Sequence, residues 1–489
     1  MNWSRGLAAP FGLTVLVIAG LTACGGGGTV NNAPKVGQVA AYTPTNANEE
    51  GYWYSRYNMM SLTMQSGLGE SFMPTMDDMT MAMQAAAQNP ADPAMAPVNP
   101  ALLNVVYAGG DPHYVTATNP MDFGTLRWKG DPAKVTTVEA TAWTITKEIE
   151  WAKLFHVDSH FGTPTSSFGA TQRFAGMMFA PMVKMQFMAL QQNPGRFGTS
   201  KLGDFALLTA YSDAAGFFGA ATMPHSTTNR YADAMASQSD TAMASTQFQK
   251  VLLANPADVR EFSSAIQSIV WYASIAKDPV ELASARSAIV KWADAISVNA
   301  ASSPVDRAYA LRGLIEAGRT TGIAKYLDQA ATVYQALIAN FDSVHGVLDG
   351  STTLTTDGVG EIAGALNAAT LFLGNRIDQA ALKQLFGAWW EGTVNLSGFQ
   401  IAAPAIPDFK GAYETQQDPI NLRYPKLALP KDVGTPYGTA PVFAASVKWT
   451  NSGWQANQNW FDTAGAMHAA NEFVWFHNDE VNGFPDVKF

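Results

Sequence analysis

The sequence has a single cysteine, Cys24, in 489 residues, and this scarcity excludes several kinds of site. A disulfide within the chain would need a second cysteine, and so would a zinc site built from paired thiolates. If Cys24 is consumed by another role, no thiol remains to act as a nucleophile. A site for a soft metal would therefore have to use methionine and histidine.

Charged residues are also scarce. Asp, Glu, Lys and Arg make up 14% of the chain, against about 25% in an average globular protein. The balance is acidic, because 40 acidic residues outnumber 30 basic ones. Binding to a phosphate backbone needs a concentrated positive patch, so we expect no nucleic acid partner.

Several motifs that identify enzymes are missing from the sequence. It contains no CxxCH haem attachment site, no P-loop, no GxSxG nucleophile elbow and no HExxH zinc motif. The stretch from Gly358 to Ala363, GVGEIA, formally matches part of a dinucleotide-binding fingerprint. We discard this match, because the preceding STTLTTD does not read as a buried strand and no βαβ unit surrounds it.

The apolar run near the start, Phe11 to Leu21, is too short to span a bilayer. It follows the positive charge of Arg5 and precedes small residues, which is the layout of a secretory signal. Residues 21–24, LTAC, resemble the lipobox of bacterial lipoproteins, in which the signal is cleaved before an acylated cysteine. The alternative is a simple signal peptide in which the cysteine is incidental.

The resemblance implies that residues 1–23 are a signal peptide and that Cys24 carries the lipid. Gly25 stands where such families place an aspartate to retain a lipoprotein at the inner membrane, so the resemblance implies the outer membrane. Residues 24–50, rich in Gly, Asn and Pro, predict a flexible tether. We therefore expect an exported protein, bound to the membrane through acylated Cys24, whose body begins near Gly51.

Helical periodicity dominates residues 51–489. Helical windows begin near Ala257, Val280, Pro304, Gly322, Asp357 and Asp378. Taken in pairs, these windows repeat about every fifty residues, which is the length of a helical hairpin with its loop. This spacing predicts an all-α fold of stacked hairpins, either an α/α toroid or a solenoid, because hairpins cannot bury their apolar faces alone. Two irregular segments interrupt it: a Met-rich stretch at 51–100 and a long loop rich in Pro and aromatics at 397–442.

Two histidines, His156 and His160, lie four residues apart. On a helix this spacing turns both rings toward one metal ion, so the pair is a candidate metal site. The alternative is that the rings cap or line a loop, because the pair follows the end of a predicted helix.

A polar loop between two predicted helices holds Asp342, His345 and Asp349. Two carboxylates and an imidazole within eight residues could supply an acid–base pair, so we name these three as candidate catalytic residues. The same residue types also form turns and helix caps, and Asp357 just beyond them has the position of an N-cap.

Methionine is the strongest anomaly of composition, because nine of the twenty lie between Met59 and Met95. Thioethers are soft ligands that suit Cu(I), so Met73, Met76 and Met79 are candidate copper ligands. Methionine also serves as flexible core filler, which is the alternative. Titration of this segment with Cu(I) tests the hypothesis, and no uptake at stoichiometric copper would exclude it.

These features support two functional interpretations. The first is an outer-membrane lipoprotein whose helical body binds a ligand or a protein partner, with copper or redox handling as an accessory role. The alternative is an enzyme on an α/α toroid that acts on a glycan or related polymer, since the hairpin number and loop lengths are similar to those of such proteins. Its first residues to test are Asp342, Asp349, Glu391, Asp462, His345 and His468. A structural role in a surface layer ranks last.

Overall fold

The structure is a computed structural model. It describes residues 44–72, 102–116, 126–154, 167–223, 227–297, 301–350, 352–403, 432–450, 452–475 and 483–489. Several predictions concern residues outside these ranges: the signal and lipidation at Cys24, the histidine pair at 156 and 160, the methionines at 73, 76 and 79, and most of the 397–442 loop.

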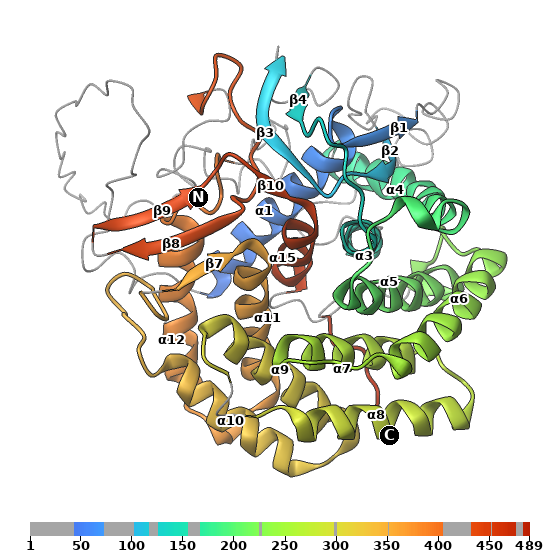
Figure 1. Cartoon of the computed structure of the whole chain (residues 1–489), viewed down its shortest axis with the longest axis vertical. Coiled ribbons are helices and arrows are strands. Elements are labelled where there is room, and N and C mark those ends of the chain that lie inside the picture. Colours follow the sequence, from blue (N-terminus) through green and yellow to red (C-terminus); the bar gives the residue numbers. More distant parts are fainter. Residues whose placement is uncertain are drawn as a thin grey trace, which may run out of the picture.

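Among the described residues, six helices form an inner ring. In ring order they are α3 (Val138–Leu154), α5 (Lys201–Gly219), α7 (Val259–Ala273), α9 (Pro304–Thr321), α11 (Thr356–Phe372) and α15 (Thr463–Trp475). Each packs against the next, and α15 packs against α3, so the ring is closed. Figure 1 shows these helices around a common centre.

Six further helices of the described chain pack outside the ring. They are α4 (Ser167–Gln192), α6 (Ala234–Leu253), α8 (Pro279–Ala295), α10 (Ala324–Ile338), α12 (Gln379–Trp389) and α1 (Pro44–Met64). The first five follow and contact their inner partners in chain order, from α3 to α11. The sixth, α1, packs against α15, so the two ends of the described chain complete the last inner–outer pair. None of the described helices is long and apolar enough to cross a membrane.

The helix starts follow local sequence signals. Asp258, Asp278 and Asp378 accept hydrogen bonds from backbone N–H groups at the starts of α7, α8 and α12. Ser303 and Asp306 form a capping box at the start of α9, where Pro304 occupies the first turn. The prediction of a predominantly helical fold is therefore confirmed. Two details differ: α1 begins at Pro44, before the predicted start of the body, and the N-cap of α11 is Thr355, not Asp357.

The term all-α is only approximate, because short antiparallel strands accompany the helices. Two three-stranded sheets have the orders β10–β3–β4 and β7–β8–β9. The other strands pair as β1–β2 and β5–β6. Their bounds are β1 (Gly69–Phe72), β2 (Leu102–Val106), β3 (Gly109–Thr116), β4 (Arg127–Gly130), β5 (Thr222–Met223), β6 (Thr227–Thr228), β7 (Thr353–Thr355), β8 (Ser446–Thr450), β9 (Gly453–Asn457) and β10 (Phe461–Asp462). Strands β7 and β10 run directly into α11 and α15, so both larger sheets reach the N-terminal end of the inner ring.

Tryptophan and other aromatic side chains fill much of the space between the two rings. Trp390, in the π-helical turn η6 (Trp390–Asn395) after α12, lies 4.6 Å from Phe473 of α15, measured between ring centroids. Tyr54 of α1 stacks near the same indole at 6.5 Å. Full burial of each large apolar side chain contributes about 1.5–3 kcal/mol. These rings therefore fix α1 and α12 against α15.

Two glycines let α11 approach its neighbours closely. A Cβ atom added to Gly360 would lie 2.6 Å from the Cα atom of Ala469 on α15. A Cβ atom at Gly364 would overlap the paired side chains of Arg312 and Glu472. Gly360 also belongs to the stretch that resembles a nucleotide fingerprint in the sequence, and the structure shows it as a packing residue within a helix.

We predict that Gly364→Ala lowers the free energy of unfolding by about 1–3 kcal/mol, because the new methyl group overlaps a buried ion pair. Gly216→Ala in α5 is the matched control. A Cβ atom at Gly216 would contact only Ile275 Cγ2, at 3.7 Å. The higher helix propensity of alanine should therefore stabilise this variant by up to about 1 kcal/mol. Guanidinium unfolding of both variants measures the difference, and equal effects would contradict the prediction.

Candidate functional site

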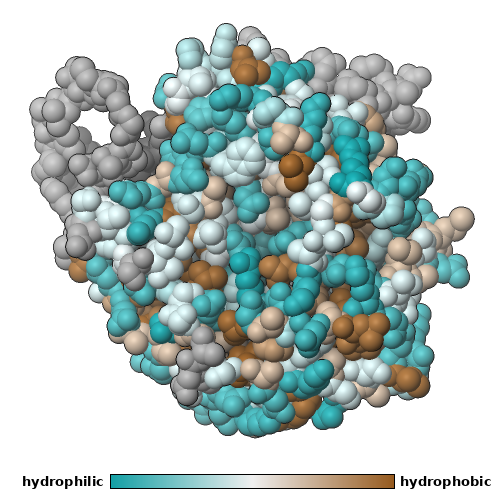
Figure 2. Space-filling model, viewed as in Figure 1, coloured by the Kyte–Doolittle hydropathy of each residue, from teal (hydrophilic) through white to brown (hydrophobic). Residues whose placement is uncertain are grey.

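A cavity lies at the centre of the ring, and all six inner helices line it. Most of its lining residues come from the N-terminal halves of these helices, whereas Gln267 and Trp271 of α7 and Glu472 of α15 lie farther along. They are Glu139, Trp143, Leu202, Phe205, Ala206, Thr209, Arg260, Ser264, Gln267, Trp271, Tyr309, Arg312, Asp357, Glu361, Ala464, His468 and Glu472. The interior has about 40 Å³ of space for the centres of water-sized molecules, enough for about three waters. Figure 2 shows that hydrophilic residues predominate around the middle of this face.

Three carboxylates gather where inner helices begin: Glu139 and Asp357 line the mouth of the cavity, and Asp462 lies close beside them without being a lining residue. Glu139 and Asp357 are the second residues of α3 and α11, and Asp462 directly precedes α15. Asp462 accepts hydrogen bonds from the backbone N–H groups of Gly465 and Ala464. Burial, together with the charges of Asp357 and Glu139, nevertheless raises the pKa of Asp462 to about 6.

The two other carboxylates at the mouth have different partners. Asp357 forms an ion pair with Arg260 of α7, so a fixed positive charge compensates it. Glu139 accepts a hydrogen bond from Ser200 Oγ at 3.3 Å. Burial is the main cause that raises the pKa of Glu139, and the charge of Asp357 adds to it. The cluster therefore combines one ion-paired carboxylate with two carboxyl groups whose pKa values are raised.

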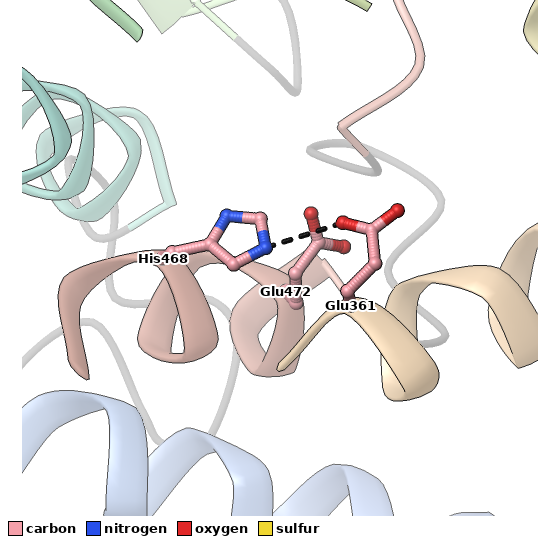
Figure 3. A group of neighbouring side chains, drawn as sticks. All are labelled: Glu361, His468 and Glu472. Carbon is pink, nitrogen blue, oxygen red and sulfur yellow. Dashed lines mark ion pairs between the residues drawn. The ribbon is translucent and has the colours of Figure 1, made fainter. Parts of the chain in front are cut away.

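Four charged or titratable side chains form the floor of the cavity. Arg312 Nη1 lies 2.6 Å from Glu472 Oε2, and both side chains are 2% exposed. His468 Nε2 lies 3.3 Å from Glu361 Oε2, and Figure 3 shows His468 and Glu472 of α15 facing Glu361 of α11. Burial alone would lower the pKa of His468, but Glu361 and Glu472 outweigh it and raise that pKa above its ordinary value. The floor is thus a buried network of opposite charges.

Aromatic side chains form much of the wall between floor and mouth. Trp143 of α3 lies 4.6 Å from the imidazole of His468, measured between ring centroids. Arg260 lies over the ring of Tyr309, with 5.3 Å from its guanidinium carbon to the ring centroid. Trp271 and Phe205 complete this wall. The cavity therefore offers flat apolar surfaces beside its acids.

The candidate catalytic residues predicted from the sequence lie elsewhere. His345 Nδ1 lies 2.6 Å from Asp342 Oδ2, and the imidazole packs on Trp449 of β8 at 4.5 Å. Asp342 also closes a turn, because its carboxylate accepts hydrogen bonds from Val344 N and His345 N. Asp342, His345 and Asp349 do not line the central cavity. The structure thus pairs the first two in a partly exposed turn.

Of the other residues proposed for a toroid enzyme, His468 lies in the floor of the cavity and Asp462 lies beside its mouth, next to Asp357. Glu391 is instead buried behind α12, where its Oε2 accepts a hydrogen bond from Asn395 Nδ2 at 2.8 Å. His345 and His468 belong to different places, so these two histidines do not converge on one pocket.

The sequence interpretation missed five charged residues of the cavity: Glu139, Arg260, Arg312, Glu361 and Glu472. The sequence does contain a signal for two of these residues, Glu361 and Glu472. Asp357 and Glu361 are four residues apart on a largely apolar helix, and so are His468 and Glu472. Polar residues with this spacing on a buried helix face share one side, which here is the side that faces the cavity.

No family model matches the chain, and no curated protein matches it. A solved structure described as a polysaccharide lyase is similar, with 12% sequence identity and a TM-score of 0.36. The match covers 70% of this chain and 90% of that one. A likeness this weak carries no argument about activity, so the site is interpreted from its own geometry.

We predict that Asp462→Asn stabilises the protein at pH 7 and that the gain disappears at low pH. The pKa of Asp462 is raised from 3.8 to about 6, so between these values the folded state binds more protons than the unfolded state. The contribution of Asp462 to the free energy of unfolding is therefore fully present below about pH 4 and is lost as the pH rises through about 6. One pKa unit corresponds to about 1.4 kcal/mol, which limits the gain to about 3 kcal/mol.

Asp378→Asn is the control for this measurement. Asp378 also accepts backbone hydrogen bonds at a helix start, but it is exposed and outside the cavity. Asparagine caps a helix about as well as aspartate, so neither substitution removes the cap. Urea unfolding from pH 4 to pH 7 should show a pH-dependent gain for Asp462→Asn alone, and a gain independent of pH would contradict the interpretation.

Proposed function

We propose that this protein is an α/α-toroid enzyme that hydrolyses a neutral or basic glycan by general acid–base catalysis at the mouth of the central cavity. The observation that carries the proposal is the pair of carboxylates with opposite environments at that mouth. Asp462 has a pKa of about 6, and Asp357 is ion-paired with Arg260. A carboxyl group with a raised pKa beside an ion-paired carboxylate supplies the two acidic residues that glycoside hydrolysis uses.

Each residue has a defined role in this reaction. Protonated Asp462 donates its proton to the leaving glycosidic oxygen as the carbon–oxygen bond breaks. Asp357 accepts a proton from the attacking water, whose oxygen forms the new bond to the anomeric carbon. Water is thereby added across the glycosidic bond. Arg260 acts as a positioning residue that holds Asp357 through their ion pair.

The charges of the cavity favour hydrolysis of a neutral glycan over elimination from an acidic one. Four carboxylates line it against two guanidinium groups, and a single protonated His468 does not remove this excess. Elimination from a uronate would need a cation to neutralise the substrate carboxylate. Both guanidinium groups already face carboxylates of the protein, Arg260 facing Asp357 and Arg312 facing Glu472.

The size of the cavity limits how the substrate binds. Space for about three waters is too small for a complete sugar residue at the floor. We therefore place the sugars across the mouth, where Trp143 and Tyr309 line the cavity together with Asp357 and Glu139. The two sheets at the same end of the ring would flank a bound polymer.

The lipid anchor and copper handling remain proposals based on sequence alone. Cys24, His156, His160 and the methionines at 73, 76 and 79 lie outside the described residues. A lipoprotein at the outer membrane is compatible with a glycan-degrading enzyme, because tethering keeps the enzyme close to incoming polymer. An accessory ligand-binding role for the body is the competing interpretation, which an assay for hydrolysis distinguishes.

We predict that Asp462→Asn and Asp357→Asn each lower kcat by about 10²–10⁴-fold on a neutral glycan that the wild type degrades. Release of reducing ends measures hydrolysis, and ultraviolet absorbance of an unsaturated product would reveal elimination instead. The panel of polymers should include neutral, basic and uronate-containing glycans. In the wild type we expect the pH profile of kcat/KM to fall as Asp462 loses its proton, above about pH 6.

Asp328→Asn is the matched control for Asp357→Asn. Asp328 on outer helix α10 forms a comparable pair with Arg376, 2.8 Å from its Nε atom, and should leave kcat unchanged. Asp342→Asn tests the competing candidate from the sequence. Loss of activity in Asp342→Asn but not in Asp462→Asn would reject the cavity as the active site, as would the absence of hydrolysis across the whole panel.

We predict that Cys24→Ser moves the protein from the detergent-extracted membrane fraction to the soluble fraction, because serine cannot carry the thioether-linked lipid. Fractionation of cells, together with incorporation of labelled fatty acid, measures the change. Activity toward a soluble glycan should persist in the variant. A membrane-bound Cys24→Ser protein would show that Cys24 is not the anchor.

A further inference from the structure

Three side chains at the cavity floor converge closely enough to hold one metal ion. Glu361, His468 and Glu472 each offer one ligand atom, and these atoms lie within 4.8 Å of one another. The first comes from α11 and the other two from successive turns of α15. All three side chains are buried, and Figure 3 shows that they face one another. Two adjacent rigid helices therefore fix the geometry.

Part of this cluster lacks the hydrogen bonds that burial demands. Neither ring nitrogen of His468 has a hydrogen-bond partner among the described residues, although the residue is only 5% exposed. Glu361 Oε2 also lacks one, because its 3.3 Å approach to His468 Nε2 does not have hydrogen-bond geometry. An unsatisfied buried polar group costs about 1–3 kcal/mol. These atoms point to a ligand between them.

We propose that Glu361, His468 and Glu472 form a Zn²⁺ site at the floor of the central cavity. Ligand atoms about 2.1 Å from zinc in a tetrahedral arrangement are about 3.4 Å apart, which agrees with the 3.3 Å between His468 Nε2 and Glu361 Oε2. The combination of one imidazole with two carboxylates suits zinc, whereas Ca²⁺ and Mg²⁺ take oxygen ligands.

Neighbouring residues orient the two carboxylates. Gln267 Nε2 donates to Glu361 Oε1 at 3.4 Å, which leaves Oε2 directed toward His468. Arg312 Nη1 holds Glu472 Oε2 at 2.6 Å and anchors that carboxylate at the floor. Outer contacts of this kind fix metal ligands and usually change affinity by about 10–100-fold when removed.

The cavity provides the fourth position of the tetrahedron. Three protein ligands with an open side facing water are the arrangement of a zinc site that can bind a water or a substrate oxygen. The adjacent space for about three waters fits this position. The proposed hydrolysis uses Asp462 and Asp357 without a metal, so either assignment can fail alone, but a bound Zn²⁺ would offset the excess of carboxylates from which the neutral substrate was inferred.

Calorimetric titration of the chelator-treated, full-length protein with ZnCl₂ tests the site in the absence of substrate. We expect one zinc per chain. His468→Gln and Glu361→Gln should each abolish stoichiometric binding, and Gln267→Ala should weaken it by about 10–100-fold. Co²⁺ in place of zinc should give the intense visible absorption of a tetrahedral site. Zinc at 100 times its Kd should stabilise the wild type by about 2.7 kcal/mol.

Two control variants distinguish this site from others in the chain. His345→Gln is matched to His468→Gln, because both imidazoles pack on a tryptophan and face a carboxylate. It should bind zinc as the wild type does. The double variant His156→Gln/His160→Gln tests the histidine pair predicted from the sequence. The proposal is overturned if the wild type binds no zinc, if His468→Gln and Glu361→Gln retain it, or if only the double variant loses it.

Discussion

The close packing of α11 against α15 is the constraint on which both the ring and its centre depend. Gly360 faces Ala469 with no room for a side chain, and one turn later Gly364 faces the ion pair of Arg312 with Glu472. This approach brings Glu361 beside His468. A wider separation of the two helices would break the buried charge network. The same contact also joins the last inner helix to the hairpins that precede it.

Closure of the ring is the part of the fold that the sequence could least reveal. Helix α1 supplies the outer partner of α15, although more than 400 residues separate them, as in the hydrogen bond from Ser55 Oγ to the Ala470 carbonyl. Helical periodicity and caps such as Ser303 depend on neighbours in the chain, so they were predictable. The choice between toroid and solenoid depends on contacts between the chain ends, which no local pattern encodes. The short strands depend equally on remote pairing, as Thr353 with Lys448 shows.

The site shows the same division between local and remote information. Asp462 and His468 could be named from the sequence because histidines and acids are few, but their partners come from other helices. Asp357 has the sequence signature of a helix start, and only its contact with Arg260 of α7, 97 residues away, gives it a second role. Asp342 and His345 illustrate the opposite case, in which residues close in sequence meet in one local turn and their catalytic role stays a prediction. Their spacing suggested chemistry, yet they form a local turn that packs on Trp449.

The pairing of every arginine in the cavity with an acid decides what the cavity can do. Arg260 and Arg312 would be the natural anchors for an acidic polymer, but each is committed to a carboxylate of the protein. The uncompensated charge of the cavity is therefore negative, and it lies partly at the mouth and partly at the floor. Near the mouth, burial together with the neighbouring carboxylates raises the pKa of Asp462, which supports its proposed role as a proton donor. At the floor, carboxylates surround His468, whose ring nitrogens have no hydrogen-bond partner among the described residues, which supports the proposed metal site. The same excess of carboxylates thus underlies both proposals.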